Sequence, residues 1–306
     1  MGPLYSMRSM TPLAHRLVRR VARRYPSLRG TGLVTRTLDR MGLSERTGTW
    51  MRGEAFAECP AMELDLRDPF QRRVFYFPNA HRRHYLPPAL RAEIERHVSP
   101  GATFLDIGAN LGFLTMFASR RVGPHGRVIA FEPEPTTFAS LSRSAALQPF
   151  ANITCLPVAL SDADRGEQAL FQASSGTAHS LHAESTEHAD RYRGSTTVRV
   201  TSLDALVASG QLALANIAFA KIDVEGNEAS VLAGMTATLA SSKYPPIWVE
   251  VRGPQGSTRA PSTFAKVMSV VEPLGYRAYR LGPRAEREVA VHDVIGREDI
   301  LLRCPR

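Results

Sequence analysis

The chain has 306 residues, of which 43% are apolar and 22% are charged, and this composition is typical of a globular protein with one large α/β domain or two smaller ones. No apolar run reaches 18 residues, and Arg16, Arg19 and Arg20 interrupt the N-terminal segment, so we predict neither a membrane span nor a secretory leader. The three cysteines show no CxxC spacing, which argues against disulfides or a zinc site and favours a reducing, cytoplasmic location.

The net charge of +9 is concentrated at the N-terminus, where residues 1–50 hold ten arginines and two acidic residues. Residues 11–24 place apolar side chains on one stripe and most arginines off it, which predicts a basic amphipathic helix. Such a helix either packs on its own domain or lies at an anionic membrane or lipid-linked substrate, with nucleic acid as a third partner class. We therefore assign residues 1–60 to a basic helical arm, in which 25–60 is loosely structured apart from a short helix near 34–41.

Residues 61–100 are predicted to form a cap over the main domain. Two apolar stretches, 62–66 and 73–77, are typical of strands, and Asp68-Pro69 between them favours a β-hairpin. Pro87 and Pro88 then open a helix over 89–97.

From residue 101 onward, strands and helices alternate regularly, which predicts a Rossmann-like α/β domain over 101–306 with helices on both faces of a mostly parallel, seven-stranded sheet. The predicted strands are 103–107, 127–131, 153–158, 167–171, 196–201, 217–222, 246–250, 276–281 and 299–303. The predicted helices are 111–121, 135–147, 203–208, 228–239 and 261–274. Residues 172–194 are polar and predict a loop, and a ligand is expected at the carboxyl edge of the strands.

A short buried strand at 103–107 runs into a glycine-rich turn and then a helix, which is typical of a nucleotide-binding α/β unit. A dinucleotide fingerprint requires glycine at 108, 110 and 113, but Asn110 and Phe113 break it. Asp106 would repel a pyrophosphate and suits a ligand with positive charge. S-adenosylmethionine carries an ammonium and a sulfonium, so we predict that it is the cofactor. The candidate binding residues in this turn are Asp106, Gly108, Ala109, Asn110 and Gly112.

Two further stretches complete the predicted cofactor site. Glu132 ends the second strand 20 residues after Gly112, where a carboxylate can accept hydrogen bonds from both ribose hydroxyls. Ala159, Ser161 and Asp162 follow the third strand, where small side chains admit an adenine ring; a capped turn is the alternative.

Asp223 and Glu225 follow the strand 217–222, beside the expected methyl donor. A carboxylate there could take a proton from a substrate hydroxyl as a general base, hold the cofactor ammonium, or act with Lys221 as a structural group. Glu250 could join Asp223 in binding a metal ion, but no third ligand is identifiable, so we predict no metal site.

Five motifs together resemble the FkbM family of S-adenosylmethionine-dependent methyltransferases. They are FLDIGANLGF (104–113), GRVIAFEPEP (126–135), ALSD (159–162), TSLDAL (201–206) and AKIDVEGNEASVLAGM (220–235). The resemblance implies a class I fold and O-methylation of a hydroxyl on a sugar, glycolipid or polyketide-type product. It also implies that Asp106, Gly108, Asn110, Gly112 and Glu132 bind the cofactor.

Two alternatives stay open at this point. A nucleic-acid methyltransferase would suit the basic charge, but the place of its usual Asn/Asp-Pro-Pro-aromatic signature holds Asp223-Val-Glu-Gly226, so we expect no nucleic acid partner. A protein of this fold that binds ligands without catalysis is the second alternative. The acceptor and the oligomeric state are not indicated by the sequence.

Overall fold

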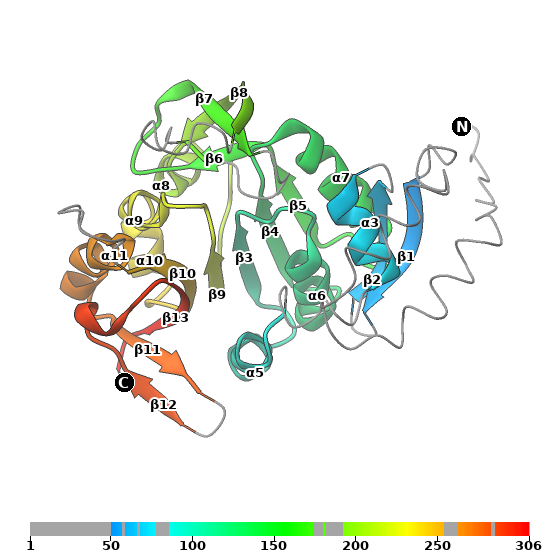
Figure 1. The fold of residues 1–306 in the computed structure, drawn as a ribbon. Helices are drawn as coiled ribbons and strands as arrows, with labels where there is room; N and C mark the ends of the chain where they lie inside the picture. Colours follow the sequence, from blue (N-terminus) through cyan, green and yellow to red (C-terminus); the bar gives the residue numbers. More distant parts are fainter. Residues whose placement is uncertain are drawn as a thin grey trace. The chain divides into compact units, whose positions relative to one another are not determined.

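The computed structural model describes residues 50–56, 59–65, 68–77, 86–173, 180–181, 192–253, 262–282 and 285–305. The chain divides into two compact units, 1–87 and 88–306, and each is described by itself (Figure 1). The helices predicted over 11–24 and 34–41 lie outside the described residues. Within the described part of the chain, no helix has the length and apolar character needed to cross a bilayer.

The described elements of the first unit are strands β1 (Trp50–Phe56) and β2 (Cys59–Asp65) and helix α3 (Pro69–Tyr76). The predicted hairpin over 62–77 is wrong in its second half, because residues 69–76 are helical. The carboxylate of Asp68 accepts a hydrogen bond of 2.7 Å from the backbone N–H of Gln71, so Asp68 and Pro69 start a helix instead of turning a hairpin. The antiparallel partner of β2 is β1, which lies in the stretch predicted to be loosely structured.

The second unit is built around an eight-stranded sheet with the order β12-β11-β13-β10-β9-β3-β4-β5. Its strands are β3 (Thr103–Ile107), β4 (Arg127–Phe131), β5 (Ile153–Leu156), β9 (Ile217–Ile222), β10 (Ile247–Arg252), β11 (Arg277–Leu281), β12 (Glu286–Glu288) and β13 (Arg297–Arg303). The five strands from β10 to β5 run parallel, and β13 lies antiparallel between β10 and β11. The order confirms the predicted Rossmann-like fold; the added edge strand β12 is wholly charged and exposed, so the sequence shows no strand pattern there.

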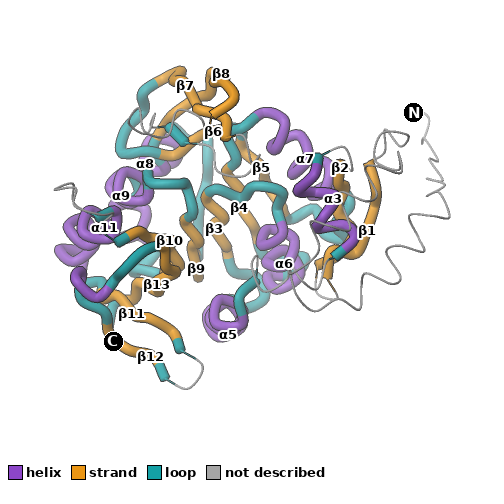
Figure 2. Tube along the Cα trace, viewed as in Figure 1, coloured by secondary structure: helices purple, strands orange, loops and turns teal. Residues whose placement is uncertain are grey.

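Helices cover both faces of this sheet (Figure 2). They are α5 (Pro88–His97), α6 (Phe113–Val122), α7 (Pro135–Ala146), α8 (Leu203–Ala208), α9 (Glu228–Ala233), α10 (Thr236–Ser241) and α11 (Thr263–Val271). Helices α6 and α7 pack on β3, β4 and β5, while α9 and α11 pack on β10 on the other face. The latter face holds the large apolar core, to which α8 and α10 also contribute. Burial on two faces explains the nearly continuous apolar strands.

The predicted helix over 228–239 is broken into α9 and α10 at Gly234. A Cβ atom at this position would lie 1.9 Å from the carbonyl oxygen of Ser161, so this close contact between the two backbone segments requires glycine at 234. The next helix starts at Thr236, where the carboxylate of Asp204 accepts from the backbone N–H of Thr238 at 2.8 Å. A long-range contact thus overrides the helical periodicity.

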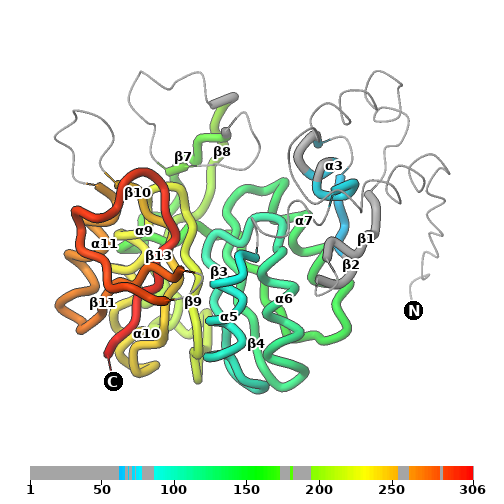
Figure 3. Tube along the Cα trace, turned by 60° about the horizontal axis from the view of Figure 1, so that its bottom comes forward, coloured from blue at the N-terminus to red at the C-terminus, as the bar shows by residue number. Residues whose placement is uncertain are grey.

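A second, three-stranded sheet has the order β6-β8-β7 and consists of β6 (Val158–Leu160), β7 (Gly166–Ala173) and β8 (Tyr192–Thr201). The predicted strand 153–158 is therefore two strands in two sheets, because Pro157 cannot donate to a ladder and separates β5 from β6. Strands were predicted at 167–171 and 196–201; they lie within β7 and β8, which pair antiparallel and extend past the main sheet (Figure 3). The predicted loop 172–194 lies outside the described residues except at its ends and at 180–181.

Candidate active site at the carboxyl edge of the sheet

The turn after β3 is held close to two neighbouring strands by backbone contacts. Gly108 N–H and Ala109 N–H donate to the carbonyl oxygen of Phe131 at 3.1 and 2.9 Å. Gly108 has φ +75°, and a Cβ there would lie 1.9 Å from the backbone oxygen of Asp223. Both observations require glycine at 108, because only glycine allows this conformation and this approach together. The turn is thereby fixed between the ends of β4 and β9.

Glu132 joins the turn to the end of β4 through both carboxylate oxygens. Oε2 accepts from the backbone N–H of Asn110 and Oε1 from that of Glu134, each at 2.9 Å. Burial raises the pKa of Glu132 to about 7, while these two N–H groups act in the opposite direction. Each oxygen keeps a second lone pair. These lone pairs could accept ribose hydroxyls, and the ribose role of Glu132 stays a prediction.

Asp106 lies beneath the turn and is completely buried. One carboxylate oxygen accepts from the Thr115 hydroxyl at 2.5 Å, and the other lies 3.9 Å from the Lys221 ammonium. Burial raises the pKa of Asp106, against the effect of Lys221 and Thr115. Direct contact of Asp106 with the cofactor remains a prediction.

The residues predicted to hold the adenine lie in β6 of the smaller sheet and directly after it. Ala159 packs in a small apolar cluster with Leu170 and the β8 valines, and the backbone N–H of Ser161 donates to Thr201. Asp162 is bound by Arg165, with N–O distances of 2.8 to 3.1 Å. These bonds fit the alternative of a capped turn, and the adenine role of Ala159, Ser161 and Asp162 stays a prediction.

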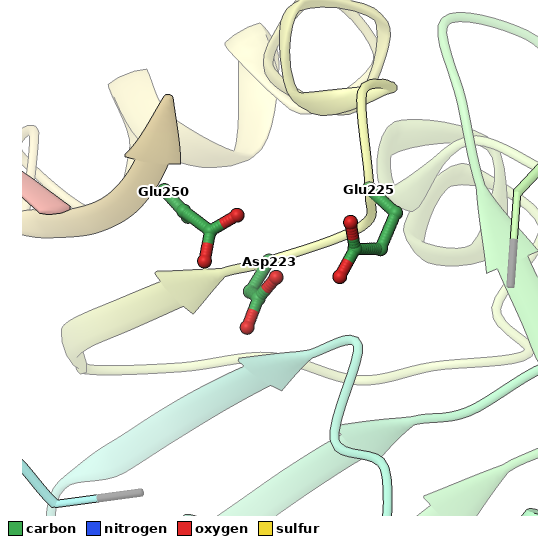
Figure 4. A group of neighbouring side chains, drawn as sticks. All are labelled: Asp223, Glu225 and Glu250. Carbon is green, nitrogen blue, oxygen red and sulfur yellow. The ribbon is translucent and has the colours of Figure 1, made fainter. Parts of the chain in front are cut away.

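Three carboxylates meet at the ends of β9 and β10: Asp223, Glu225 and Glu250. One oxygen of each lies within 4.8 Å of the others, and Figure 4 shows the side chains turned toward a common space. Lys221 links this group to the turn after β3, because its Nζ donates to the Gly108 carbonyl at 2.8 Å and lies 3.4 Å from Asp223 Oδ2. The structure thus brings the predicted carboxylates and the glycine turn to one edge.

Two arginines that the sequence analysis missed bind the same group. Arg252 donates to Glu225 Oε2, and Arg297 donates to Glu225 Oε1 at 3.2 Å and to Glu250 Oε1. A divalent ion would have to displace these guanidinium groups from its ligands, so the donor set fits a metal ion poorly. At this edge of the sheet, Arg252 and Arg297 are already bound to carboxylates. A further ligand with positive charge suits the remaining carboxylate oxygens, and S-adenosylmethionine is such a ligand.

The turn at 223–227 is itself held by buried groups that the sequence analysis did not single out. The carboxylate of Glu228 accepts from the N–H groups of Gly226 and Val224, at 2.9 and 3.4 Å, and Asn227 donates to the carbonyl of Leu160 at 3.0 Å. Glu228 is two residues past a glycine at the start of a helix, where a carboxylate often binds backbone N–H groups. The sequence could therefore have predicted this role of Glu228.

The strand order and the glycine turn, which Glu132 binds from the end of β4, define a class I methyltransferase fold. Residues 106–278 match the family model described as the methyltransferase FkbM domain. The chain therefore belongs to the FkbM family and carries an S-adenosylmethionine-dependent methyltransferase domain, as the sequence predicted.

Named relatives include the hexuronic acid methyltransferase AglP of Haloferax volcanii, which is 34% identical over 139 residues, or 45% of this chain and 52% of the relative. The chain thus matches about half the length of this relative. Among solved structures, the methyltransferase FkbM from Methylobacillus flagellatus matches 89% of this chain and 60% of its own, with 13% identity and a TM-score of 0.37. An O-methyltransferase from Bacillus cereus matches 71% and 78%, with 12% identity and a TM-score of 0.37.

Proposed function

We propose that this protein is an O-methyltransferase that transfers the methyl group of S-adenosylmethionine to a hydroxyl of a sugar-type acceptor. The observation that carries the proposal is the bond between Glu132 and the glycine turn, which lies inside the segment 106–278 that matches the family model. The sugar class is supported by the relative that acts on a hexuronic acid. Glycolipid and polyketide acceptors carry similar hydroxyls and belong to the same proposal.

In this proposal each residue at the edge has a limited task. Bound S-adenosylmethionine supplies an electrophilic methyl group, and the turn 108–112 and Glu132 hold its nucleoside. Asp223 accepts a proton from the acceptor hydroxyl, since its side chain is one-third exposed beside the turn. Alignment of the hydroxyl with the methyl group supplies a large part of the rate, because transfer is an in-line displacement.

Contact with a membrane through the basic helix at 11–24 stays a prediction, because that helix lies outside the described residues. A lipid-linked sugar at a membrane surface would be the acceptor that makes such a contact useful.

The test is transfer of labelled methyl groups from S-adenosylmethionine by the full chain into separated fractions of glycans, lipids, RNA and protein. We expect label in the glycan or glycolipid fraction, sensitive to treatments that cleave sugars. A Glu132→Ala variant serves as the control, because it should bind the cofactor weakly and transfer little. Label confined to RNA would overturn the proposed acceptor class, and absence of label from every fraction would favour a binding protein without catalysis.

A further inference from the structure

The three carboxylates at the ends of β9 and β10 differ in how their oxygens are used. Glu225 has both oxygens bound to arginines, Oε2 to Arg252 and Oε1 to Arg297. Its backbone lies in the left-handed region at φ +54°, a conformation that a non-glycine residue adopts only when its surroundings hold it. Glu225 thus ties the turn after β9 to β10 and β13, and two guanidinium groups face its negative charge.

Asp223 and Glu250 each have one carboxylate oxygen close to a cation. Asp223 has Lys221 at 3.4 Å from Oδ2, and this lysine also binds the Gly108 carbonyl of the cofactor turn. Glu250 binds Arg297 through Oε1, and its side chain is 14% exposed, against 33% for Asp223. The two carboxylates therefore lie next to the turn with oxygens that are not used by the arginines.

Carboxylates outnumber cations around the group formed by Asp223, Glu225 and Glu250. The cations that interact with this group are Lys221 from β9, Arg252 from β10 and Arg297 from β13. Three further carboxylates interact with Asp223: Asp106 from β3, Glu228 from α9 and Asp299, which lies opposite Glu250 in the β10–β13 ladder. A half-buried excess of negative charge is offset either by a bound proton or by a cationic ligand.

We propose, resting on the function proposed above, that Glu250 holds a proton beside the Asp223 carboxylate, releases it when the positively charged cofactor binds, and regains one that Asp223 takes from the acceptor hydroxyl during transfer. The C–O bond replaces the C–S bond, the positive charge on sulfur is lost, and the hydroxyl proton moves to the carboxylate pair. Atoms and charge therefore balance without a further co-reactant. Glu225 is a positioning residue in this scheme, and Glu250 is a second proton acceptor beside Asp223.

The electrostatics of the site agree with this assignment. Burial, followed by the Asp223 carboxylate, raises the pKa of Glu250 against the effect of Arg297, and the net value is about 8. A carboxylate with this pKa holds its proton near neutral pH until a positive charge comes close. The Asp223 carboxylate in turn favours the charged form of Lys221, whose pKa is raised although burial alone would lower it.

The test is isothermal titration calorimetry of the full chain with S-adenosylmethionine and with S-adenosylhomocysteine, in buffers with different ionisation enthalpies. The two ligands differ by the methyl group and the positive charge on sulfur. At about pH 7 we expect S-adenosylmethionine to release roughly half a proton or more in excess of S-adenosylhomocysteine. Equal proton release by the two ligands would overturn the inference and leave the proposed function intact, whereas failure of both ligands to bind would count against both.

Variants assign the proton to its residues. Glu250→Gln and Asp223→Asn should each remove most of the difference between the ligands, while affinity for S-adenosylhomocysteine changes less than about threefold. Glu225→Gln should keep the difference, because Glu225 only positions the turn in this scheme, through its bonds to Arg252 and Arg297. Glu286→Gln, on the edge strand β12, is the matched control and should be unchanged. A full difference in both Glu250→Gln and Asp223→Asn would refute the assignment, and either variant decides the matter if the other does not fold.

Discussion

The two halves of the site are built by different means. Around β3 and β4, the turn at 108–112 is fixed by backbone bonds and by Glu132, which lies 22 residues from its partner Asn110. At the ends of β9 and β10, the geometry depends on ion pairs between side chains, and Arg297 lies 72 residues from Glu225. The first half, called the rigid half below, depends on close backbone contacts that tolerate little change in shape. The second half, called the charge-balanced half below, depends on paired charges. A charged ligand or a change of pH can alter the protonation of its side chains.

The first prediction tests the rigid half and has the largest expected effect. Gly108→Ala should lower the free energy of unfolding by more than about 3 kcal/mol, because it adds steric overlap to backbone strain. Its Cβ would lie 1.9 Å from the backbone oxygen of Asp223. Urea unfolding of the purified chain measures the change.

Gly210→Ala is the matched control for this experiment. Gly210 has φ +72°, nearly the same as Gly108, but no atom lies within 4 Å of the place of its Cβ. We expect a cost of about 1 kcal/mol from strain alone. Equal costs for the two variants would mean that the close approach to Asp223 contributes nothing.

The second prediction concerns the charge-balanced half. Asp223→Asn should lower the turnover number about 100-fold, because an amide cannot accept the hydroxyl proton, while affinity for S-adenosylhomocysteine changes less than about threefold. Steady-state methyl transfer to the acceptor fraction and calorimetry provide the two values. Asp164→Asn is a suitable control, since Asp164 is exposed and pairs with Arg199. Unchanged turnover in Asp223→Asn would remove this residue from the mechanism.

The sequence predicted the half around β3 and β4 better than the half at the ends of β9 and β10. Strands β3, β4 and β9, the glycine turn and Glu132 are encoded in short local patterns, and the structure contains them as predicted. Helix α3 was missed, because its apolar residues also fit a strand and only the Asp68 side chain decides. The break between α9 and α10 and the arginines that bind Glu225 depend on partners far along the chain. Local periodicity carries no information about such contacts.

The third prediction returns to the rigid half and to the ribose assignment. Glu132→Ala should weaken binding of both S-adenosylmethionine and S-adenosylhomocysteine by roughly 10- to 30-fold, which corresponds to the loss of hydrogen bonds to a charged acceptor. Glu132→Gln keeps one acceptor oxygen and should have a smaller effect. Because ionisation of Glu132, with its pKa of about 7, favours these bonds, affinity in the unmodified protein should rise with pH through neutrality. Equal affinities in all three proteins would refute the ribose role.

The last prediction uses stability to examine the charge balance without any ligand. Glu250 has a pKa of about 8 in the folded protein against an ordinary value of 4.5, so between these values the folded state holds more protons than the unfolded state. The stability contribution of the protonated form is therefore complete below about pH 4.5 and is lost as pH rises through about 8.

Gln cannot ionise, so Glu250→Gln should lose less stability over this window. We expect a relative gain of about 3 kcal/mol between about pH 5 and about pH 8, because each pKa unit between 4.5 and about 8 corresponds to about 1.4 kcal/mol. Urea unfolding at both pH values measures this gain, with Glu286→Gln as a variant that should follow the unmodified protein. A difference that stays constant with pH would mean that Glu250 is already ionised throughout. The excess negative charge at this edge would then have to be offset by a proton on another carboxylate.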